Sequence, residues 1–203
     1  KVVGTAGSVL DNLSVFDILE NAHRSTVAIA MGELGLMSRI LALRYDACFL
    51  TYATPDRGNS VAPGQLPIST MRNVYHVANI DASTKIFGVL SNQQISEELL
   101  HTLNVATLKS KINGVWIPFV ASGRRCSVTD VIRSFDVLGV AGYVVDESAH
   151  KDISELANDS EVIDWDDAAN TVIVNDGGLI GEKTLNLQQS FSTITGTDTL
   201  LRV

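Results

Sequence analysis

The chain has 203 residues, of which 45% are hydrophobic and 19% are charged, and its formal net charge is −8. This composition supports one or two folded domains with a substantial apolar core, and it excludes an intrinsically disordered chain. The acidic balance argues against direct nucleic-acid binding, which needs clustered basic side chains. We interpret the one basic pair, Arg124 and Arg125, as part of a solvated loop.

Membrane and metal-binding classes are also disfavoured. No apolar run approaches the length of a membrane span and no signal-peptide pattern is present, so we expect no membrane partner and an intracellular location, in the cytoplasm, the nucleus or both. Cys48 and Cys126 lie far apart without metal-ligand spacing, which predicts free thiols, a buried Cys48 and no metal site. Because Lys1 opens directly in a predicted strand, we expect a piece of a longer polypeptide.

The first 78 residues alternate short apolar runs with segments of helical periodicity. Apolar strands separated by helices are typical of parallel βαβ units, whose strands are buried on both faces. Three such units cannot close an eight-stranded barrel, so their exposed edges should drive self-association or pairing with other chain. The expected strands cover residues 1–6, 26–31 and 48–53, and the expected helices cover 11–21, 36–44 and 69–78, the last capped by Ser69.

Residues 79–84 are polar and predict a linker, and residues 85–203 predict a second domain of the α/β class. No G-x-G-x-x-G fingerprint occurs, so we expect no nucleotide-binding half and no cofactor. The expected strands cover residues 85–90, 115–120 and 141–145, the expected helices cover 96–107, 128–138 (capped by Ser127) and 151–157, and a hairpin pairs 170–174 with 179–180.

Three separated motifs of the first segment occur in the order of a known family. The chain reads Lys-Val-Val-Gly-Thr from Lys1, Met-Gly-Glu-Leu-Gly-Leu-Met-Ser-Arg up to Arg39, and Ala-Pro-Gly-Gln up to Gln65. Together they resemble the last third of type I 3-dehydroquinate dehydratase, a (β/α)8 barrel. The resemblance implies that residues 1–78 form the last three βα units of such a barrel.

This resemblance also implies roles for single residues. Arg39 would bind the substrate carboxylate with its planar fork, and Gln65 would hydrogen-bond ring hydroxyls. The alternatives are a surface arginine on a helix and an ordinary loop amide. Lys1 matches the lysine that forms a Schiff base, against the alternative of a solvated lysine. Val61 stands where many members have a serine, and the general-base histidine lies outside this sequence, so we interpret Lys1 as a vestigial Schiff-base lysine.

The second segment resembles the substrate-binding domain of shikimate dehydrogenase at residues 84–88, 103–116 and 168–181. In that family two serines, spaced S-x-S, bind the substrate carboxylate. Here only Ser96 is retained, Gln94 takes the other place, and two glutamates follow, whose charge disfavours an anion. Asn170 matches a substrate-binding asparagine, with hydrogen bonding at the start of a strand as the alternative.

The acid/base pair of shikimate dehydrogenase is replaced in this chain. The resemblance places the catalytic lysine at His150, whose alternative role is that of a solvated loop histidine, and Lys151 is one residue away. The place of the paired aspartate is taken by Leu185. Proton transfer needs both members of this pair, so we expect no hydride transfer.

A dehydratase-like part followed by a dehydrogenase-like part is the order of the plant bifunctional enzyme and the fungal pentafunctional arom protein. It is also the order of the fungal quinate repressor family. A retained scaffold without catalytic groups favours this last resemblance, which implies a pseudoenzyme that senses a quinate-pathway metabolite and binds a transcription activator protein. The alternatives are a fragment of an active arom-type enzyme, whose dehydratase part is a lyase, and a purely structural interaction domain.

Overall fold

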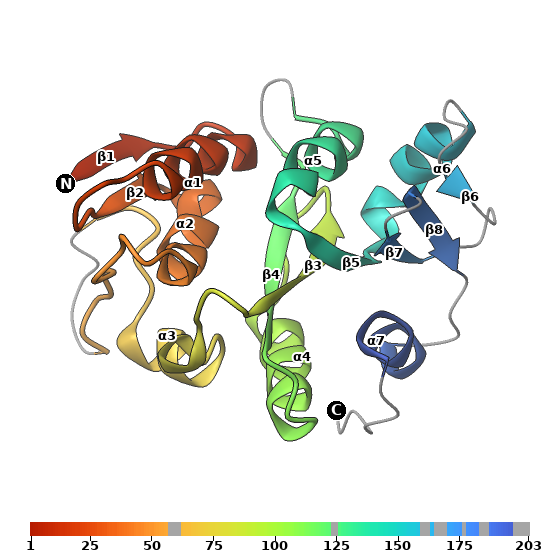
Figure 1. Ribbon diagram of the computed structural model, residues 1–203. Helices are drawn as coiled ribbons and strands as arrows, with labels where there is room; N and C mark the ends of the chain where they lie inside the picture. Colours follow the sequence, from red (N-terminus) through yellow and green to blue (C-terminus); the bar gives the residue numbers. More distant parts are fainter. Residues whose placement is uncertain are drawn as a thin grey trace. The chain divides into compact units, whose positions relative to one another are not determined.

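A computed structural model describes residues 1–56, 62–122, 126–158, 163–164, 170–175, 178–182 and 187–196. The chain divides into two compact units between Thr84 and Lys85, and Figure 1 labels their elements. Both units combine strands and helices, and the predicted α/β class is confirmed. None of the helices in the described ranges is long and apolar enough to cross a membrane.

The first unit is built on a pair of parallel strands. β1 (Val2–Thr5) and β2 (Ala28–Met31) pair from Val2 opposite Ala28 to Thr5 opposite Met31. Helix α1 (Asn12–Glu20) connects them, and α2 (Leu36–Leu41) and α3 (Ile68–Asn73) follow. Helices α1 and α2 both pack against β2, as predicted for βαβ units. The small core they form contains Val15, Leu19, Ala28, Ala30 and Ala42.

The strand predicted over residues 48–53 is wrong. Only one isolated bridge forms, between Thr26 and Cys48. The Cys48 amide donates to the Tyr45 carbonyl at 2.8 Å, which closes a turn instead of extending a ladder. Phe49 is 63% exposed and Cys48 itself is only partly buried, so this apolar run lacks the two-sided burial that its composition predicted. An apolar run forms a strand only where a neighbour satisfies its backbone.

Strand β1 is exposed along its whole length. Val2 and Val3 keep 47% and 44% of their surface accessible, and in the described part of the chain β1 pairs with β2 alone. A strand of a parallel sheet is normally covered on both faces. The edge predicted to be exposed is therefore present, and it is apolar.

The two helix caps predicted from the sequence, Ser69 and Ser127, have different outcomes. Helix α3 begins at Ile68 directly after Pro67, so Ser69 lies inside the helix and the prediction that Ser69 caps it is wrong. Proline fixes an extended entry to the first turn. The Ser69 amide instead donates to Asp56 Oδ1 at 2.8 Å. Ser127 does cap the following unit's α5 (Val128–Phe135) in a reciprocal capping box with Asp130.

The second unit is a six-stranded sheet with the order β4-β3-β5-β7-β8-β6. β3, β4 and β5 are parallel, as in predicted βαβ units, whereas β7 is antiparallel to both β5 and β8, so the predicted hairpin is confirmed. The strands are β3 (Lys85–Ser91), β4 (Gly114–Val120), β5 (Val140–Val145), β6 (Ile163–Asp164), β7 (Thr171–Asn175) and β8 (Gly178–Glu182).

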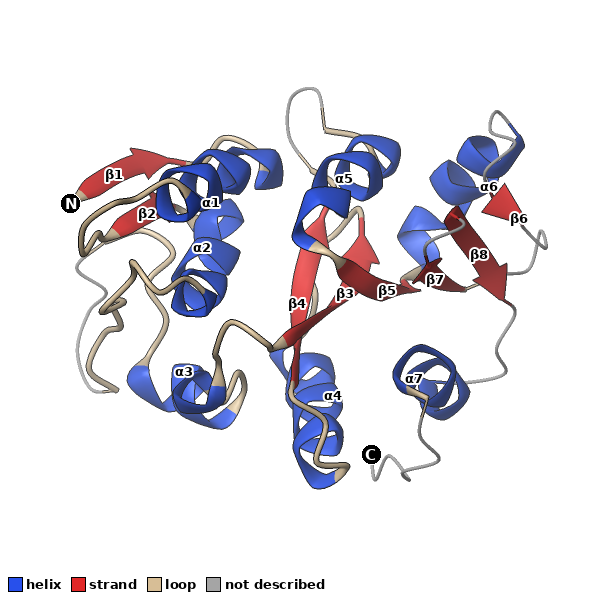
Figure 2. Ribbon diagram, viewed as in Figure 1, coloured by secondary structure: helices blue, strands red, loops and turns tan. Residues whose placement is uncertain are grey.

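Helices cover both faces of this sheet. Figure 2 shows α4 and α7 on one face, and α5 and α6 on the other. The bounds are α4 (Glu97–Lys109), α6 (His150–Asn158) and α7 (Leu187–Thr195). The fully buried Trp116 ring of β4 stacks on Phe87 of β3 at 5.1 Å and on Phe191 of α7 at 6.1 Å. Burying an aromatic side chain of this size stabilises the fold by about 2–3 kcal/mol.

Candidate functional site

Two of the sequence motifs meet at the C-terminal end of β2. Gly32 follows the strand with φ +93°, and its amide donates to the Pro63 carbonyl at 3.1 Å. Gly64 has φ +70°, and a Cβ at this position would lie 2.0 Å from the Gly32 carbonyl oxygen. Only glycine allows so close an approach in this backbone conformation. The loop that carries Gln65 is thereby fixed against the turn that leads to Arg39.

Arg39 is a buried cation. It is 2% exposed; its Nη2 donates to the Pro63 carbonyl at 3.2 Å, and its buried Nε has no hydrogen-bond partner. Burial lowers the pKa of Arg39 from its usual value. No carboxylate within the described ranges forms an ion pair with it. A buried, incompletely paired guanidinium is costly unless an anion reaches it, so the arrangement is suited to an anionic ligand.

Gln65 is the second group with unused hydrogen-bonding capacity. Its backbone amide donates to Ala62 at 3.2 Å, whereas its side-chain Oε1 is buried without a partner. An amide oxygen in this state can accept a hydrogen bond from a ligand hydroxyl. Val61, which replaces a serine in the family pattern, lies outside the described residues.

Lys1 contacts other residues than Arg39 and Gln65 do. It precedes β1, whereas the turn at Gly32 lies beyond the other end of the sheet. The side chain is exposed, and its ammonium lies over the Tyr52 ring, 4.6 Å from the centroid. Since Gln65 Oε1 has no partner, Lys1 does not bond to it. The structure therefore brings the helix that carries Arg39 into contact with the loop that carries Gln65. Lys1 instead contacts the Tyr52 ring.

In the second unit, polar side chains connect the loops after β3 and β5. The Ser91 hydroxyl lies 3.2 Å from Asp146 Oδ1 and 3.1 Å from the Ser148 hydroxyl. The Asn92 amide group donates to the Ser148 carbonyl at 2.9 Å and to Asp152 Oδ2 at 2.7 Å. We call these five residues the edge network. Sequence analysis missed it, although polar residues directly after two parallel strands are a usable signal.

The edge network holds Asp146 ionised. Burial raises the pKa of this carboxyl, but hydrogen bonds from Ser148 and Ser91 and the nearby His150 outweigh burial, so its pKa lies below the usual range. Ser148 alone donates twice to Asp146 Oδ1, through its hydroxyl at 2.6 Å and its amide at 3.1 Å. The hydrogen-bond donors of the edge network thus bond to the carboxylates of the same network. It leaves a negative rather than a positive environment at this edge.

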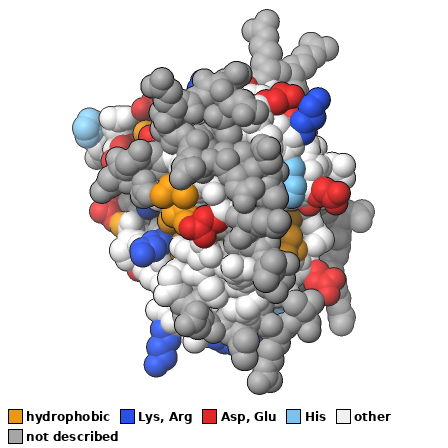
Figure 3. Space-filling model, turned by 90° about the vertical axis from the view of Figure 1, so that its right-hand side faces the viewer, with side chains coloured by type: hydrophobic (Ala, Val, Ile, Leu, Met, Phe, Trp, Pro, Cys, Tyr) orange, Lys and Arg blue, Asp and Glu red, His pale blue; other side chains and the backbone are white. Residues whose placement is uncertain are grey.

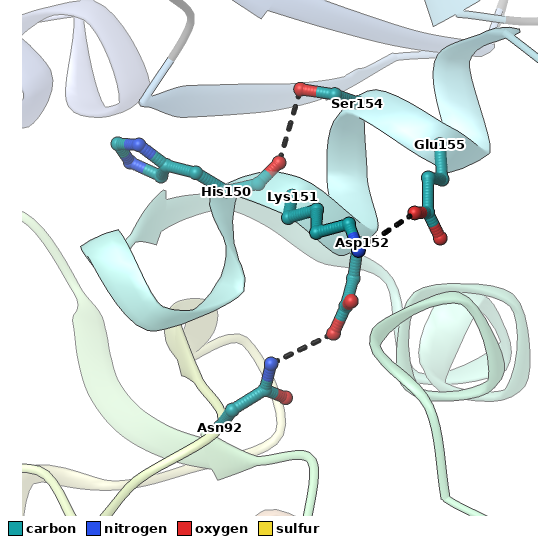
Figure 4. Close-up of polar contacts among 6 residues, drawn as sticks. All are labelled: Asn92, His150, Lys151, Asp152, Ser154 and Glu155. Carbon is teal, nitrogen blue, oxygen red and sulfur yellow. Dashed lines mark hydrogen bonds and ion pairs between the residues drawn. The ribbon is translucent and has the colours of Figure 1, made fainter.

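Figure 4 shows where the chain places the residues next to this network. The His150 ring turns back so that Nε2 lies 3.2 Å from the Val145 carbonyl oxygen. Lys151 points to solvent, with its ammonium 3.6 Å from Glu155 and its side chain 85% exposed. The position that the resemblance assigns to a catalytic lysine is therefore occupied by an imidazole bound to the backbone.

Ser96 and Asn170 both have structural roles in the protein. The Ser96 hydroxyl accepts from the Leu99 amide at 3.2 Å and so caps α4. Asn170 precedes β7; its carbonyl accepts from Val145 at 2.8 Å, and its amide donates to Glu182 at 3.1 Å. These backbone bonds attach the start of β7 to β5 and β8. Leu185 lies outside the described residues.

On the one face drawn in Figure 3, the charged side chains of the described residues form no single strong patch. On the face shown in Figure 3, the described acidic side chains are scattered, with basic side chains between them. A nucleic-acid backbone would require gathered basic side chains. In the described ranges, no three His, Cys, Asp or Glu side chains are grouped as metal ligands.

Comparisons with known proteins agree with this two-part architecture. Residues 1–82 match the family model of type I 3-dehydroquinase. The chain is 32% identical over 117 residues to the chloroplastic bifunctional 3-dehydroquinate dehydratase/shikimate dehydrogenase of Arabidopsis thaliana, covering 58% of this chain and 19% of that protein. An alignment of 117 residues cannot fit within residues 1–82, so this similarity extends into the second unit.

Two further relatives cover one or both parts. A 3-dehydroquinate dehydratase of Dehalococcoides mccartyi is 36% identical over 85 residues, covering 41% of this chain and 38% of that protein. The dehydroquinate dehydratase and shikimate dehydrogenase structure from S. pombe AroM is 20% identical, with a TM-score of 0.37, over 88% of this chain and 34% of that chain. The part of each of these two relatives that this chain matches is between about a fifth and two fifths of the relative's length. Residues 1–82 are thus similar to type I 3-dehydroquinases, and the similarity to the bifunctional plant protein continues into the α/β part that follows.

Proposed function

We propose that this chain is the metabolite-binding part of a catalytically defective regulator of the quinate repressor type. The observation that carries the proposal is the contact of His150 with the Val145 carbonyl, at the position where the resemblance places a catalytic lysine. The neighbouring Lys151 pairs with Glu155 at the surface. Neither side chain is placed for the proton transfer that reduction of a ketone requires. The proposal needs no cofactor.

The first unit supplies the ligand site in this proposal. Arg39 offers a buried guanidinium whose Nε is unpaired, and Gln65 offers an unpaired amide oxygen. The first group binds a carboxylate, and the second accepts from a ring hydroxyl. A carboxylated, hydroxylated ring such as quinate or 3-dehydroquinate carries both groups. Binding relieves the cost of burying these polar atoms unpaired.

Signalling in this proposal passes through protein contact. The net charge of −8 disfavours direct nucleic-acid binding, so a transcription activator protein is the partner that the proposal names. The exposed valines of β1 also favour association of the first unit with a second copy. The metabolite would then set whether the activator is held.

Titration of the purified chain with quinate, 3-dehydroquinate, 3-dehydroshikimate and shikimate tests this function. We expect saturable binding of at least one metabolite by calorimetry, with no turnover in the same sample and no oxidation of shikimate with a nicotinamide cofactor. Conversion of any metabolite would contradict the proposal. The absence of all binding would leave a purely structural interaction domain as the better account.

A fragment of an active arom-type enzyme is the second candidate function. Residues 1–82 match the type I 3-dehydroquinase family, and the motif resemblance assigns Lys1, Arg39 and Gln65 to the positions of its site residues. Borohydride reduction in the presence of 3-dehydroquinate tests it. A covalent adduct on Lys1, but not on the strand lysine Lys85, would favour the enzyme. Free Lys1 after reduction would favour the regulator.

A further inference from the structure

A buried asparagine joins three segments of the first unit. Asn12 is fully buried at the start of α1. Its Nδ2 donates to the Val9 and Leu34 carbonyls, both at 2.7 Å, and its Oδ1 accepts from the Ser38 amide at 3.2 Å. Asn12 makes three of the four side-chain hydrogen bonds open to an asparagine. Two of them reach residues more than twenty positions along the chain.

These two distant bonds fall on the beginning of α2. This helix has only six residues, and its N-cap, Gly35, provides no side-chain hydrogen bond. A helix this short is marginal by itself, and the amides of its first turn need partners. Asn12 Oδ1 supplies a partner to the Ser38 amide, and Asn12 Nδ2 holds the Leu34 carbonyl in the preceding turn. Asn12 therefore caps α2 from another helix.

Contacts with β2 complete the attachment of α2. The Ser38 hydroxyl donates to the Gly35 carbonyl at 2.7 Å and accepts from the Ala30 amide at 3.0 Å. A Cβ on Gly35 would lie 2.2 Å from the Ala30 carbonyl oxygen, so the helix start is in direct contact with the strand. Arg39 is the next residue after Ser38. Its place is thus set by the backbone that Asn12 and Ser38 hold.

We propose that Asn12 is a positioning residue for the Arg39 anion site, which rests on the metabolite-binding function proposed above. Asn12 does not contact the ligand. It fixes the first turn of α2, so that the Arg39 guanidinium stays buried and bound to the Pro63 carbonyl with Nε free for an anion. Groups that position a binding residue in this way must hold it within a fraction of an ångström.

The second unit provides a matched control for this role. Asn104 is 2% exposed, and its side chain also makes three hydrogen bonds. Its Nδ2 donates to Leu100 at 3.0 Å and to Trp116 at 3.1 Å, and its Oδ1 accepts from the Trp116 amide at 2.8 Å. It fastens α4 to β4 and makes none of these bonds to the first unit. A variant of Asn104 loses the same kind of buried bonds without touching α2.

The experiment compares Asn12→Ala with Asn104→Ala by two readouts. The first is the rate at which phenylglyoxal modifies Arg39, mapped by mass spectrometry, which reports guanidinium exposure without any metabolite. The second is affinity for the metabolite that the wild-type chain binds. We expect Asn12→Ala to raise the rate of Arg39 modification about tenfold and to lower metabolite affinity about tenfold. Losses of this size are known for residues that orient a ligand-binding group by hydrogen bonds. Asn104→Ala should change neither.

A second variant covers the case in which Asn12→Ala does not fold. Asn12→Asp keeps an acceptor for the Ser38 amide but loses the donors to Val9 and Leu34, so it should speed Arg39 modification relative to the wild type. Equal Arg39 modification in the Asn12 and Asn104 variants would overturn the positioning role. If the wild-type chain binds no metabolite, the proposed function fails, while the modification rates still decide the role of Asn12.

Discussion

The two units treat their buried polar groups in opposite ways. In the first unit, Arg39 Nε and Gln65 Oε1 are buried without partners. In the second, the edge network joins Ser91, Asn92 and Ser148 to the carboxylates of Asp146 and Asp152. A buried polar group without a hydrogen-bond partner destabilises the protein, and a ligand that bonds to it removes this cost. A network whose groups are already paired has no such cost for a ligand to remove. The difference favours the first unit as the place of the proposed ligand site.

The largest expected effect follows from removing the cation of the first unit. Arg39→Met should lower metabolite affinity by about a hundredfold, or about 2.7 kcal/mol, because the ligand carboxylate loses a charge-assisted pair. Stability should change little, since methionine fills the site without an unpaired Nε. Calorimetry and thermal unfolding measure the two effects. Arg72→Met, at an exposed position of α3, is the control and should bind as the wild type does.

The next effect concerns the loop that carries Gln65. Gly64→Ala would place a Cβ 2.0 Å from the Gly32 carbonyl oxygen at φ +70°, so one of the two loops must move. We expect a loss of about 1–3 kcal/mol in unfolding free energy, together with weaker metabolite binding. Gly4→Ala meets no atom within 4 Å and should leave binding unchanged. Equal metabolite affinity of the two variants would show that the loop carrying Gln65 is not part of the ligand site.

A smaller effect is expected in the edge network. Asn92→Ala removes the donors to Asp152 and the Ser148 carbonyl, which should cost about 1–2 kcal/mol of stability. Metabolite affinity should stay at the wild-type value because the network is not part of the site. Gln93→Ala, at the neighbouring exposed position, serves as the stability control. A metabolite that binds Asn92→Ala more weakly would show that the second unit takes part.

The pH dependence of stability provides a more sensitive test of the same network. The folded pKa of Asp146 is lowered, so its ionised form stabilises the protein above the unfolded pKa of about 3.9, and this contribution is lost as the pH falls through the folded value. Asp146→Asn should therefore be less stable than the wild type at pH 7, and the difference should narrow on acidification. Denaturant unfolding between about pH 7 and pH 3 measures it.

The smallest effect concerns association through β1. Val3→Lys places a charge on the exposed strand and should reduce self-association severalfold by light scattering, without changing metabolite binding. Val137→Lys alters a 79% exposed valine of the second unit and should leave association unchanged. A wild-type chain that is monomeric at all concentrations would contradict this expectation.

Sequence patterns predict the elements whose signals are local. β3, β4 and β5 are continuous apolar runs flanked by helices, and they form as expected. The apolar run at residues 48–53 has the same composition but lacks the neighbour that completes a ladder. The prediction of a Ser69 cap was wrong because α3 begins at Ile68, directly after Pro67. Local composition thus predicts strand formation only where the tertiary partner is present.

Parts of the candidate site could not be predicted because they depend on distant pairs. Arg39 and Gln65 stand out through motif spacing, but the partner of Arg39, the Pro63 carbonyl, is visible only in the fold. The hydrogen bonds of Asn12 cannot be predicted from the sequence, since they reach Leu34 and Ser38 across a strand and a turn. Such hydrogen bonds depend on helix packing, which periodicity does not specify.

The place of β3 in the sheet has a consequence for synthesis on the ribosome. β3 is the first strand of its unit to emerge, yet its two neighbours are β4 and β5, and β5 begins only at Val140. A nascent chain that ends before Val140 therefore leaves one side of this apolar strand unpaired. Such late, non-local pairing slows folding and favours capture by chaperones. Strand β3 can therefore gain its second neighbour only after about half of the unit has been translated.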